Sequence, residues 1–293
     1  MALGGGLLWL AGCGSPPNNP YPAGASLDAT LYRSFEERPK HLDPARAYSA
    51  NEYEIIAQIY EPLLQYHYLR RPYELSPLAA SRLPEGRLLD AEGRLLPDDA
   101  PDEAVVESVY DIVLRPDLRY APHPAFAQDA GGHHPNLRLT AAQLGGVQTL
   151  ADLGPAATRS VTAADFAYQI KRLAHPAVHS PIAEMMAEYI VGLRELGEYL
   201  VRDAGRDADR RGWLDLRAYP LAGVEVLDDR HLRIRLRGKY PQFRFWLAMP
   251  FFAPMPWEVD AFYAQPGLAE KNISLDWYPA GSGPYRLIEN NPN

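Results

Sequence analysis

Few side chains in this sequence have the types and spacing that catalysis requires. Cys13 is the single cysteine, so it has no disulfide partner and cannot serve a Cys/His site on the folded body. The sequence has no G-x-S-x-G nucleophile motif and no H-E-x-x-H zinc motif. Gly281-Ser282-Gly283 lacks the Lys and the following helix of a phosphate-binding loop. We therefore expect no enzyme activity and no cofactor.

The histidines are the best candidates for a metal site. His133 and His134 are adjacent in a Gly/Pro-rich loop, and adjacent residues lack the ligand spacing of a formed site. We predict an exposed loop there and no metal. A metal-dependent enzyme that uses His133 and His134 stays open as an alternative.

Composition limits the classes of function. The formal net charge is −8 and the pI is near 5.5, which argues against a nucleic-acid partner, because such proteins present a basic face. Hydrophobic residues make up 47% of the chain and charged residues 23%, as is usual for a globular protein. The 28 prolines predict many loops and short elements.

The N-terminus resembles a lipoprotein signal. The apolar run Leu3 to Leu10 is shorter than the about 20 residues of a membrane helix and fits a signal-peptide core. Cys13 follows Leu10-Ala11-Gly12, as in a lipobox. The start has no Lys or Arg, so a chance apolar N-terminus is the alternative. We predict that a lipid on Cys13 anchors the protein at the extracytoplasmic face.

Residues 42–66 predict a turn followed by a helix. Leu42-Asp43-Pro44 favours a turn, since proline restricts its neighbour. Asn51 is the expected N-cap, with Glu54 three residues later, and an apolar stripe at helical spacing follows. Pro62 indicates that the helix ends near Tyr60.

The remaining pattern predicts a mixed α/β fold. A helix is expected within 161–174, where Thr162 can cap it and Asp165 lies at its third position. One helix is expected over 182–200, and residues 121–160 are expected to be a surface excursion with a short helix in 137–153. The strands are expected at 31–35 and 105–114, and in a hairpin of 224–227 with 231–237 whose arginines face solvent.

Four phrases, in this order, are similar to the extracytoplasmic solute-binding proteins, family 5, of peptide-type ABC importers. They are LDP with YEPL (residues 42–44 and 60–63), YDIVLRPDLRY (110–120), TA-D with KRL (162–173) and GSGPYRL (281–287). The resemblance implies a class II-like periplasmic-binding-protein fold that holds a solute, here expected to be an oligopeptide, in a cleft between two lobes. It also implies ABC permease subunits as partners, and we expect a monomer.

The resemblance places ligand contacts after the LDP turn. By position these are Tyr48, Ser49, Asn51 and Glu52, with Tyr278, Ser282 and Gly283 as further candidates. Glu52 is expected to meet a ligand's ammonium group. Asn51 is expected either to bond a ligand backbone or only to cap its helix.

The resemblance also predicts how the chain divides into domains. The expected segments are 1–12 (signal peptide), 13–29 (lipidated Cys13 and flexible tether), 30–72 (lobe I, first part), 73–220 (inserted subdomain) and 221–293 (lobe I, second part). Because the GPY phrase lies where relatives cross into lobe II, we expect a truncated chain that lacks the second lobe and binds solute weakly. A lipoprotein interaction module without a transport role is the alternative.

Overall fold

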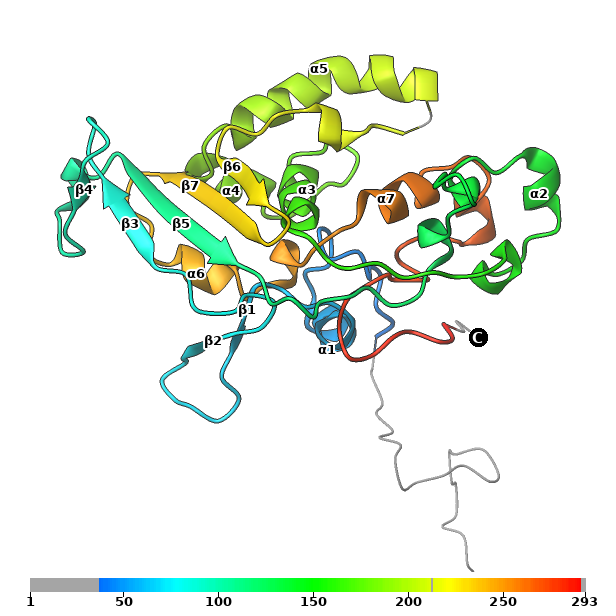
Figure 1. The fold of residues 1–293 in the computed structure, drawn as a ribbon, viewed down its shortest axis with the longest axis horizontal. Coiled ribbons are helices and arrows are strands. Elements are labelled where there is room, and N and C mark those ends of the chain that lie inside the picture. Colours follow the sequence, from blue (N-terminus) through cyan, green and yellow to red (C-terminus); the bar gives the residue numbers. More distant parts are fainter. Residues whose placement is uncertain (1–36, 212, 291–293) are drawn as a thin grey trace, which may run out of the picture. The chain divides into compact units, whose positions relative to one another are not determined.

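A five-stranded antiparallel sheet forms the β part of the fold (Figure 1). The computed structural model describes residues 37–211 and 213–290. The strand order is β4-β3-β5-β7-β6. The strands are β3 (Gly86–Leu89), β4 (Leu95–Leu96), β5 (Glu107–Val113), β6 (Val224–Asp228) and β7 (His231–Arg237). The predicted hairpin is confirmed as β6 and β7, which are paired in antiparallel register.

The two faces of β7 differ as the alternating pattern predicts. Leu232, Ile234 and Leu236 are fully buried, because alternate residues of a strand point to the same face. The arginines between them form ion pairs with acidic side chains. These pairs are Arg233–Asp111 (2.6 Å), Arg235–Glu107 (2.7 Å) and Arg237–Glu195 (2.7 Å). The arginine row is therefore explained by these ion pairs on the outer face of the strand.

Seven helices and a second, two-stranded sheet complete the regular structure of the described residues. The helices are α1 (Ala50–Ile59), α2 (Ala141–Gly145), α3 (Ala163–Leu173), α4 (Ala183–Tyr189), α5 (Leu193–Arg211), α6 (Phe243–Trp246) and α7 (Trp257–Tyr263). The short sheet pairs β1 (Leu64–Tyr66) with β2 (Leu75–Pro77). The 3-10 helices are Asp102–Ala104, Pro124–Phe126, Pro135–Leu137, Leu150–Leu153, Leu216–Ala218, Pro250–Phe252 and Ala269–Lys271. Helix α3 contacts both β6 and β7, and α4 contacts β7 (Figure 1).

Two predicted helices are confirmed at their ends. Helix α3 begins after Thr162, and the Asp165 carboxylate accepts the Thr162 N–H at 2.9 Å. Helix α1 ends at Ile59, as Pro62 indicated. The predicted N-cap of α1 is wrong, because the cap is Ser49 and not Asn51. Glu52, at the third helical position, reaches back to the Ser49 N–H at 3.0 Å.

The predicted single helix over 182–200 is also wrong. The chain forms α4 and α5 instead, because Gly192 between them adopts a φ of +81°. Other residues rarely adopt this left-handed conformation. A Cβ on Gly192 would also lie 3.1 Å from the backbone nitrogen of Ala222. The short helix expected within 137–153 is confirmed as α2.

One large hydrophobic core joins distant parts of the chain. It contains Leu63, Phe166 and Phe243, which belong to three different segments of the predicted domain division. The boundaries of that division stay a prediction. The predicted strand at 31–35, the signal peptide, the tether and Cys13 lie outside the described residues. Within the described residues, no helix has the length and apolarity to cross a membrane.

Candidate functional site

The turn before α1 is held to the helix by Glu52. One carboxylate oxygen accepts the backbone N–H groups of Lys40 (3.1 Å) and His41 (2.8 Å). The other oxygen accepts those of Tyr48 (2.9 Å) and Ser49 (3.0 Å). Burial would raise the pKa of Glu52, but the hydrogen bonds from Ser49, His41 and Tyr48 outweigh it and lower the pKa to about 2.

This geometry corrects the role expected for Glu52. Its carboxylate is buried and already accepts four hydrogen bonds, which is the number of acceptor positions that a carboxylate offers. No acceptor position remains for a ligand's ammonium group. Glu52 therefore positions the loop that carries Tyr48 and Ser49.

A second carboxylate, Asp276, holds the same turn from the far end of the chain. It accepts the N–H of Leu42 at 2.9 Å and the N–H of Asp43 at 3.4 Å. His41 lies 3.3 Å and Arg46 3.7 Å from its other oxygen. Asp276 is not among the predicted site residues, because nothing in the local pattern around it indicates a partner 234 residues away.

The Asp of the LDP phrase pairs with the Arg of the KRL phrase inside the protein. Arg172, 3% exposed, donates to both carboxylate oxygens of Asp43 at 3.0 and 2.7 Å and to Asp260 at 3.1 Å. Tyr168 donates to the other Asp260 oxygen at 2.6 Å. Burial would raise the pKa of Asp43, but Arg172 outweighs it and holds the pKa below its usual value. These two phrases thus form a structural ion pair.

The GSGPY segment packs against the C-terminal end of α1. The Gly283 N–H donates to the Ile59 carbonyl at 2.7 Å, and the Tyr285 N–H donates to the Gln58 carbonyl at 3.2 Å. A Cβ on Gly281 would lie 1.9 Å from the Ile59 oxygen. Glycine is therefore required at position 281, because the two backbones approach too closely for any side chain.

Six of the seven predicted ligand contacts fall into two groups at the ends of α1. Tyr48 is 74% exposed, with its ring centroid 6.3 Å from that of Phe251, and Ser49 is also exposed. Asn51 is half-buried in the first turn. Ser282 and Gly283 are half-buried at the opposite end, and a ten-residue helix is about 15 Å long. Figure 1 shows the red C-terminal segment passing beside α1.

Tyr278 belongs to a third group, around a buried histidine. His123 accepts the Ala125 N–H at Nδ1 (3.0 Å), so Nε2 donates to the Tyr263 hydroxyl (2.8 Å). Tyr263 in turn donates to the Tyr278 carbonyl at 2.6 Å. Burial lowers the pKa of His123 to about 3, which keeps this ring neutral. The chain of hydrogen bonds ties residues 121–127 to α7 and to the segment before GSGPY.

The two adjacent histidines have different partners. His134 donates from Nδ1 to the Ala125 carbonyl at 3.0 Å, and its Nε2 lies 3.3 Å from the Gln128 amide. His133 is exposed, 3.3 Å from Asp129. No group of three His, Cys, Asp or Glu side chains suited to a metal ion occurs in residues 37–211 and 213–290. The described structure therefore gives no support to a metal site at His133 and His134.

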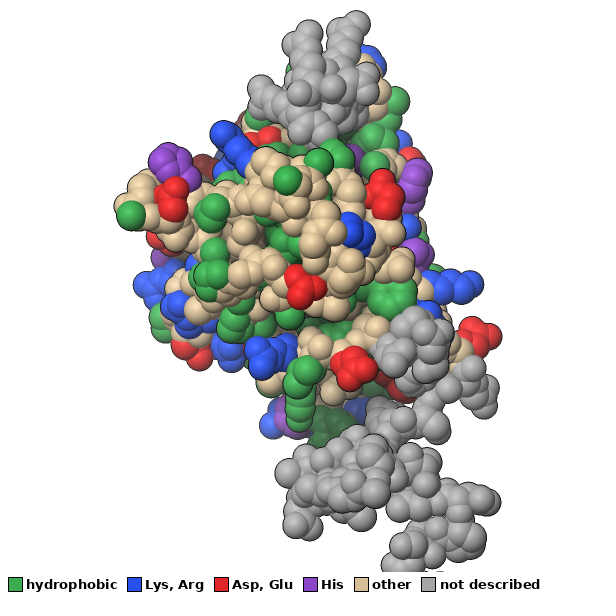
Figure 2. All heavy atoms as spheres, turned by 90° about the vertical axis from the view of Figure 1, so that its right-hand side faces the viewer, with side chains coloured by type: hydrophobic (Ala, Val, Ile, Leu, Met, Phe, Trp, Pro, Cys, Tyr) green, Lys and Arg blue, Asp and Glu red, His purple; other side chains and the backbone are tan. Residues whose placement is uncertain are grey.

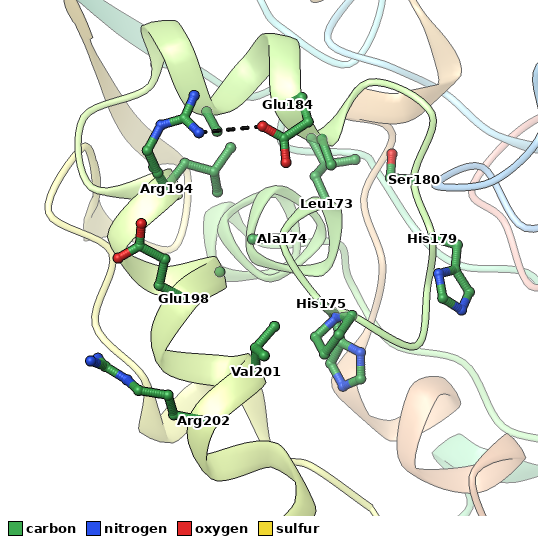
Figure 3. A pocket seen from close by; sticks show the side chains of 15 residues that line it. Leu173, Ala174, His175, His179, Ser180, Glu184, Arg194, Glu198, Val201 and Arg202 are labelled. Atoms are coloured by element: carbon green, nitrogen blue, oxygen red, sulfur yellow. Dashed lines mark hydrogen bonds and ion pairs between the residues drawn. The ribbon is translucent and has the colours of Figure 1, made fainter.

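A hollow of about 710 Å³ lies between the end of α3, α4 and α5 (Figure 3). Glu184 and Arg194 form an ion pair at 3.3 Å across one side of it. The Ser180 hydroxyl is buried without a hydrogen-bond partner among the described residues, and His175 accepts the Ala177 N–H at 3.1 Å. Ser180 and His175 therefore do not form a nucleophile and base pair. The lining carries charges of both signs and favours no class of ligand.

The second half of the chain matches a known family. Residues 158–293 match the profile of the bacterial extracellular solute-binding proteins, family 5, middle region. This part of the chain is therefore similar to the family, and the match covers a little under half of the sequence. The matched stretch contains both the KRL helix and the GSGPY segment, so two of the four phrases lie inside it. No curated protein matches the chain.

Solved structures share the fold of this chain. The murein tripeptide binding protein MppA in its unliganded open form has a TM-score of 0.52 at 19% identity, over 88% of this chain and 35% of MppA. The MppA of Escherichia coli has a TM-score of 0.50 at 19% identity, over 88% of this chain and 35% of MppA. The periplasmic oligopeptide-binding protein OppAIV of Borrelia burgdorferi has a TM-score of 0.50 at 19% identity, over 86% of this chain and 35% of OppAIV. The predicted mixed α/β binding-protein fold is confirmed, and the chain spans about a third of these structures' length.

Proposed function

We propose that this chain is part of a peptide-binding component of an ABC importer, which captures oligopeptides outside the cytoplasmic membrane and delivers them to permease subunits. The single observation that carries the proposal is the family match over residues 158–293. The names of the similar solved structures, which bind murein tripeptide and oligopeptides, support a peptide as the ligand.

The proposed ligand contacts are the exposed residues at the start of α1. Tyr48 and Ser49 lie on the loop that Glu52 and Asp276 hold in place, and Asn51 lies in the first turn. A bound peptide in an extended conformation would bond through its backbone, while the Tyr48 ring packs on its side chains. The Gly283 N–H donates to the Ile59 carbonyl and is not available to a ligand, so we assign the GSGPY segment a supporting role for α1.

A titration that detects weak binding tests this proposal. We would add a mixture of tri- to pentapeptides, up to millimolar concentration, to the isotope-labelled chain and follow backbone NMR signals. We expect shifts at residues 48–51, and Tyr48→Ala should weaken them. Tyr68→Ala is the matched control, since Tyr68 is 88% exposed and lies outside the proposed contacts. An absence of shifts at residues 48–51 would contradict the proposal.

We also propose that Cys13 carries a lipid that anchors the protein at the extracytoplasmic face. The lipobox-like sequence Leu10-Ala11-Gly12-Cys13 and the extracellular character of the family support this location. Cell fractionation tests it. We expect the natural chain in the membrane fraction and Cys13→Ser outside it; equal partition of both chains would contradict the anchor.

A further inference from the structure

A hollow of about 750 Å³ lies between α7, residues 132–138 and the residues that follow α5. Its volume is within the range of small-molecule sites. Its main lining side chains are those of Trp213, Trp257, Arg138, Arg217, His133 and His134. None of them belongs to the proposed peptide contacts at residues 48–51. Figure 2 shows the side of the molecule on which α2 lies, where acidic, basic and apolar side chains are interspersed.

Two tryptophans form the apolar wall of this hollow. The rings of Trp213 and Trp257 are stacked with centroids 5.9 Å apart and an interplanar angle of 29°. Arg217 lies over Trp257, 3.6 Å from the ring centroid, and His134 meets the same ring edge-on at 5.7 Å. Both indoles are half-buried. Flat indole surface next to a guanidinium suits a planar aromatic body, since both groups stack on aromatic faces.

Three residues that line the hollow have hydrogen-bond donors without a partner within the described residues. The indole N–H of Trp213 is buried and unpaired. Arg217 uses Nε and Nη2 to bind Asp215, at 2.8 and 2.7 Å, and leaves Nη1 without a hydrogen bond. The exposed side chain of Arg138 makes no hydrogen bond or ion pair in residues 37–211 and 213–290. A buried donor without an acceptor is costly, so a ligand acceptor at Trp213 would stabilise it.

The charged side chains that line the hollow favour a negatively charged ligand. Among the described residues, no Asp or Glu side chain lines this hollow, although the chain has 37 acidic and 29 basic residues. Asp215 forms an ion pair with Arg217, while Arg138 has no acidic partner among the described residues. The side chains left without partners are therefore donors and cations, and a carboxylate is the group that accepts from them.

We propose that this hollow is a binding site for an aromatic carboxylate. Its ring system packs on Trp213 and Trp257, and its carboxylate accepts hydrogen bonds from Arg138, Arg217 Nη1 and the Trp213 indole. The site is independent of the proposed peptide surface and does not need it to be correct.

Three related compounds test the proposal with the whole chain. Indole-3-acetate, indole-3-acetamide and tryptamine share one ring system and differ in charge. By calorimetry, we expect the acid to bind at least about tenfold more tightly than the amide, since a charge-assisted hydrogen bond is stronger than a neutral one. We expect tryptamine not to bind, because its ammonium group has the same charge as the arginines. In the isotope-labelled chain, the acid should shift the indole N–H signal of Trp213, which is assigned by its loss in Trp213→Phe.

A matched pair of exposed arginines provides the control. Arg138→Gln should weaken binding of the acid by about tenfold. Arg82→Gln should leave it unchanged, because Arg82 is also exposed and does not line the hollow. The proposal is overturned if the acid at millimolar concentration leaves the Trp213 signal unmoved, if the amide binds as tightly as the acid, or if both arginine variants bind alike.

Discussion

Arg172 is a full positive charge with 3% of its surface exposed, and its neighbours compensate the cost of that burial. Asp43 and Asp260 lie on either side of it, and together they hold its pKa above the ordinary value although burial would lower it. A buried ion pair of this kind contributes little net free energy to stability. Removing one partner is nevertheless costly, because the other charge is left buried and unpaired.

Replacing Arg172 with Leu should therefore lower the free energy of unfolding by about 3–5 kcal/mol. Asp43, which is 5% exposed, would lose its partner while still buried. Urea denaturation measures the loss. Arg70→Gln is the control, because its pair with Glu74 is exposed on both sides and should matter far less. Equal losses for the two variants would contradict the structural role of Arg172.

Glu52 should make stability depend on acid pH. Its pKa is about 2 in the folded chain against an ordinary 4.5. The unfolded chain therefore binds the proton more readily than the folded chain. The stability that Glu52 contributes is present above about pH 4.5 and is lost as the pH falls toward 2. Unfolding free energies measured across that window should fall less steeply in Glu52→Gln than in the natural chain; equal slopes would rule this out.

The sequence could predict which residue types lie near α1 but not how they bond. Tyr48 and Ser49 lie on an exposed loop between the turn and α1, and their role as ligand contacts stays a prediction. The roles of Glu52 and Asp276 could not be predicted, because both depend on backbone N–H groups brought together only by the folded chain. The sequence held one indication of the buried pair: Asp43 and Arg172 are charged residues with apolar neighbours in the sequence.

At the scale of elements, α1 and the GSGPY segment act as one unit. Gly281→Ala should lower the free energy of unfolding by about 1–3 kcal/mol or more, because the added methyl group would overlap the Ile59 carbonyl. Gly145→Ala is the control. Nothing lies within 4 Å of its Cβ, so the helix-favouring alanine should be neutral or stabilise by about 0.5–1 kcal/mol. Thermal or urea unfolding that ranks the variants in the opposite order would contradict this packing.

Helix boundaries show why some elements could be predicted and others not. Thr162 with Asp165 is a local capping pattern, and the start of α3 follows from it. The break between α4 and α5 instead depends on Gly192 lying against Ala222, 30 positions further along the chain, which no local periodicity reveals. Local chemistry therefore determines the caps, while long-range contacts determine where this helical stretch divides.

At the scale of the whole molecule, we expect residues 38–290 to unfold in one step. Strand β5 pairs with β7 along its whole length, and the largest core includes Leu63, Phe166 and Phe243. Melting the predicted inserted segment, residues 73–220, would remove one side of this sheet. Far-ultraviolet circular dichroism and tryptophan fluorescence should give one midpoint. Two separate midpoints would mean that the predicted segments fold independently.

The order of synthesis gives the Asp43–Arg172 pair a further consequence. Asp43 leaves the ribosome 129 residues before Arg172, and Asp260 follows 88 residues later. A carboxylate that is stable in the interior only beside its guanidinium has to remain in water until that partner has been translated. The turn at residues 42–44 is thus synthesised early and completed only after Arg172 has been translated.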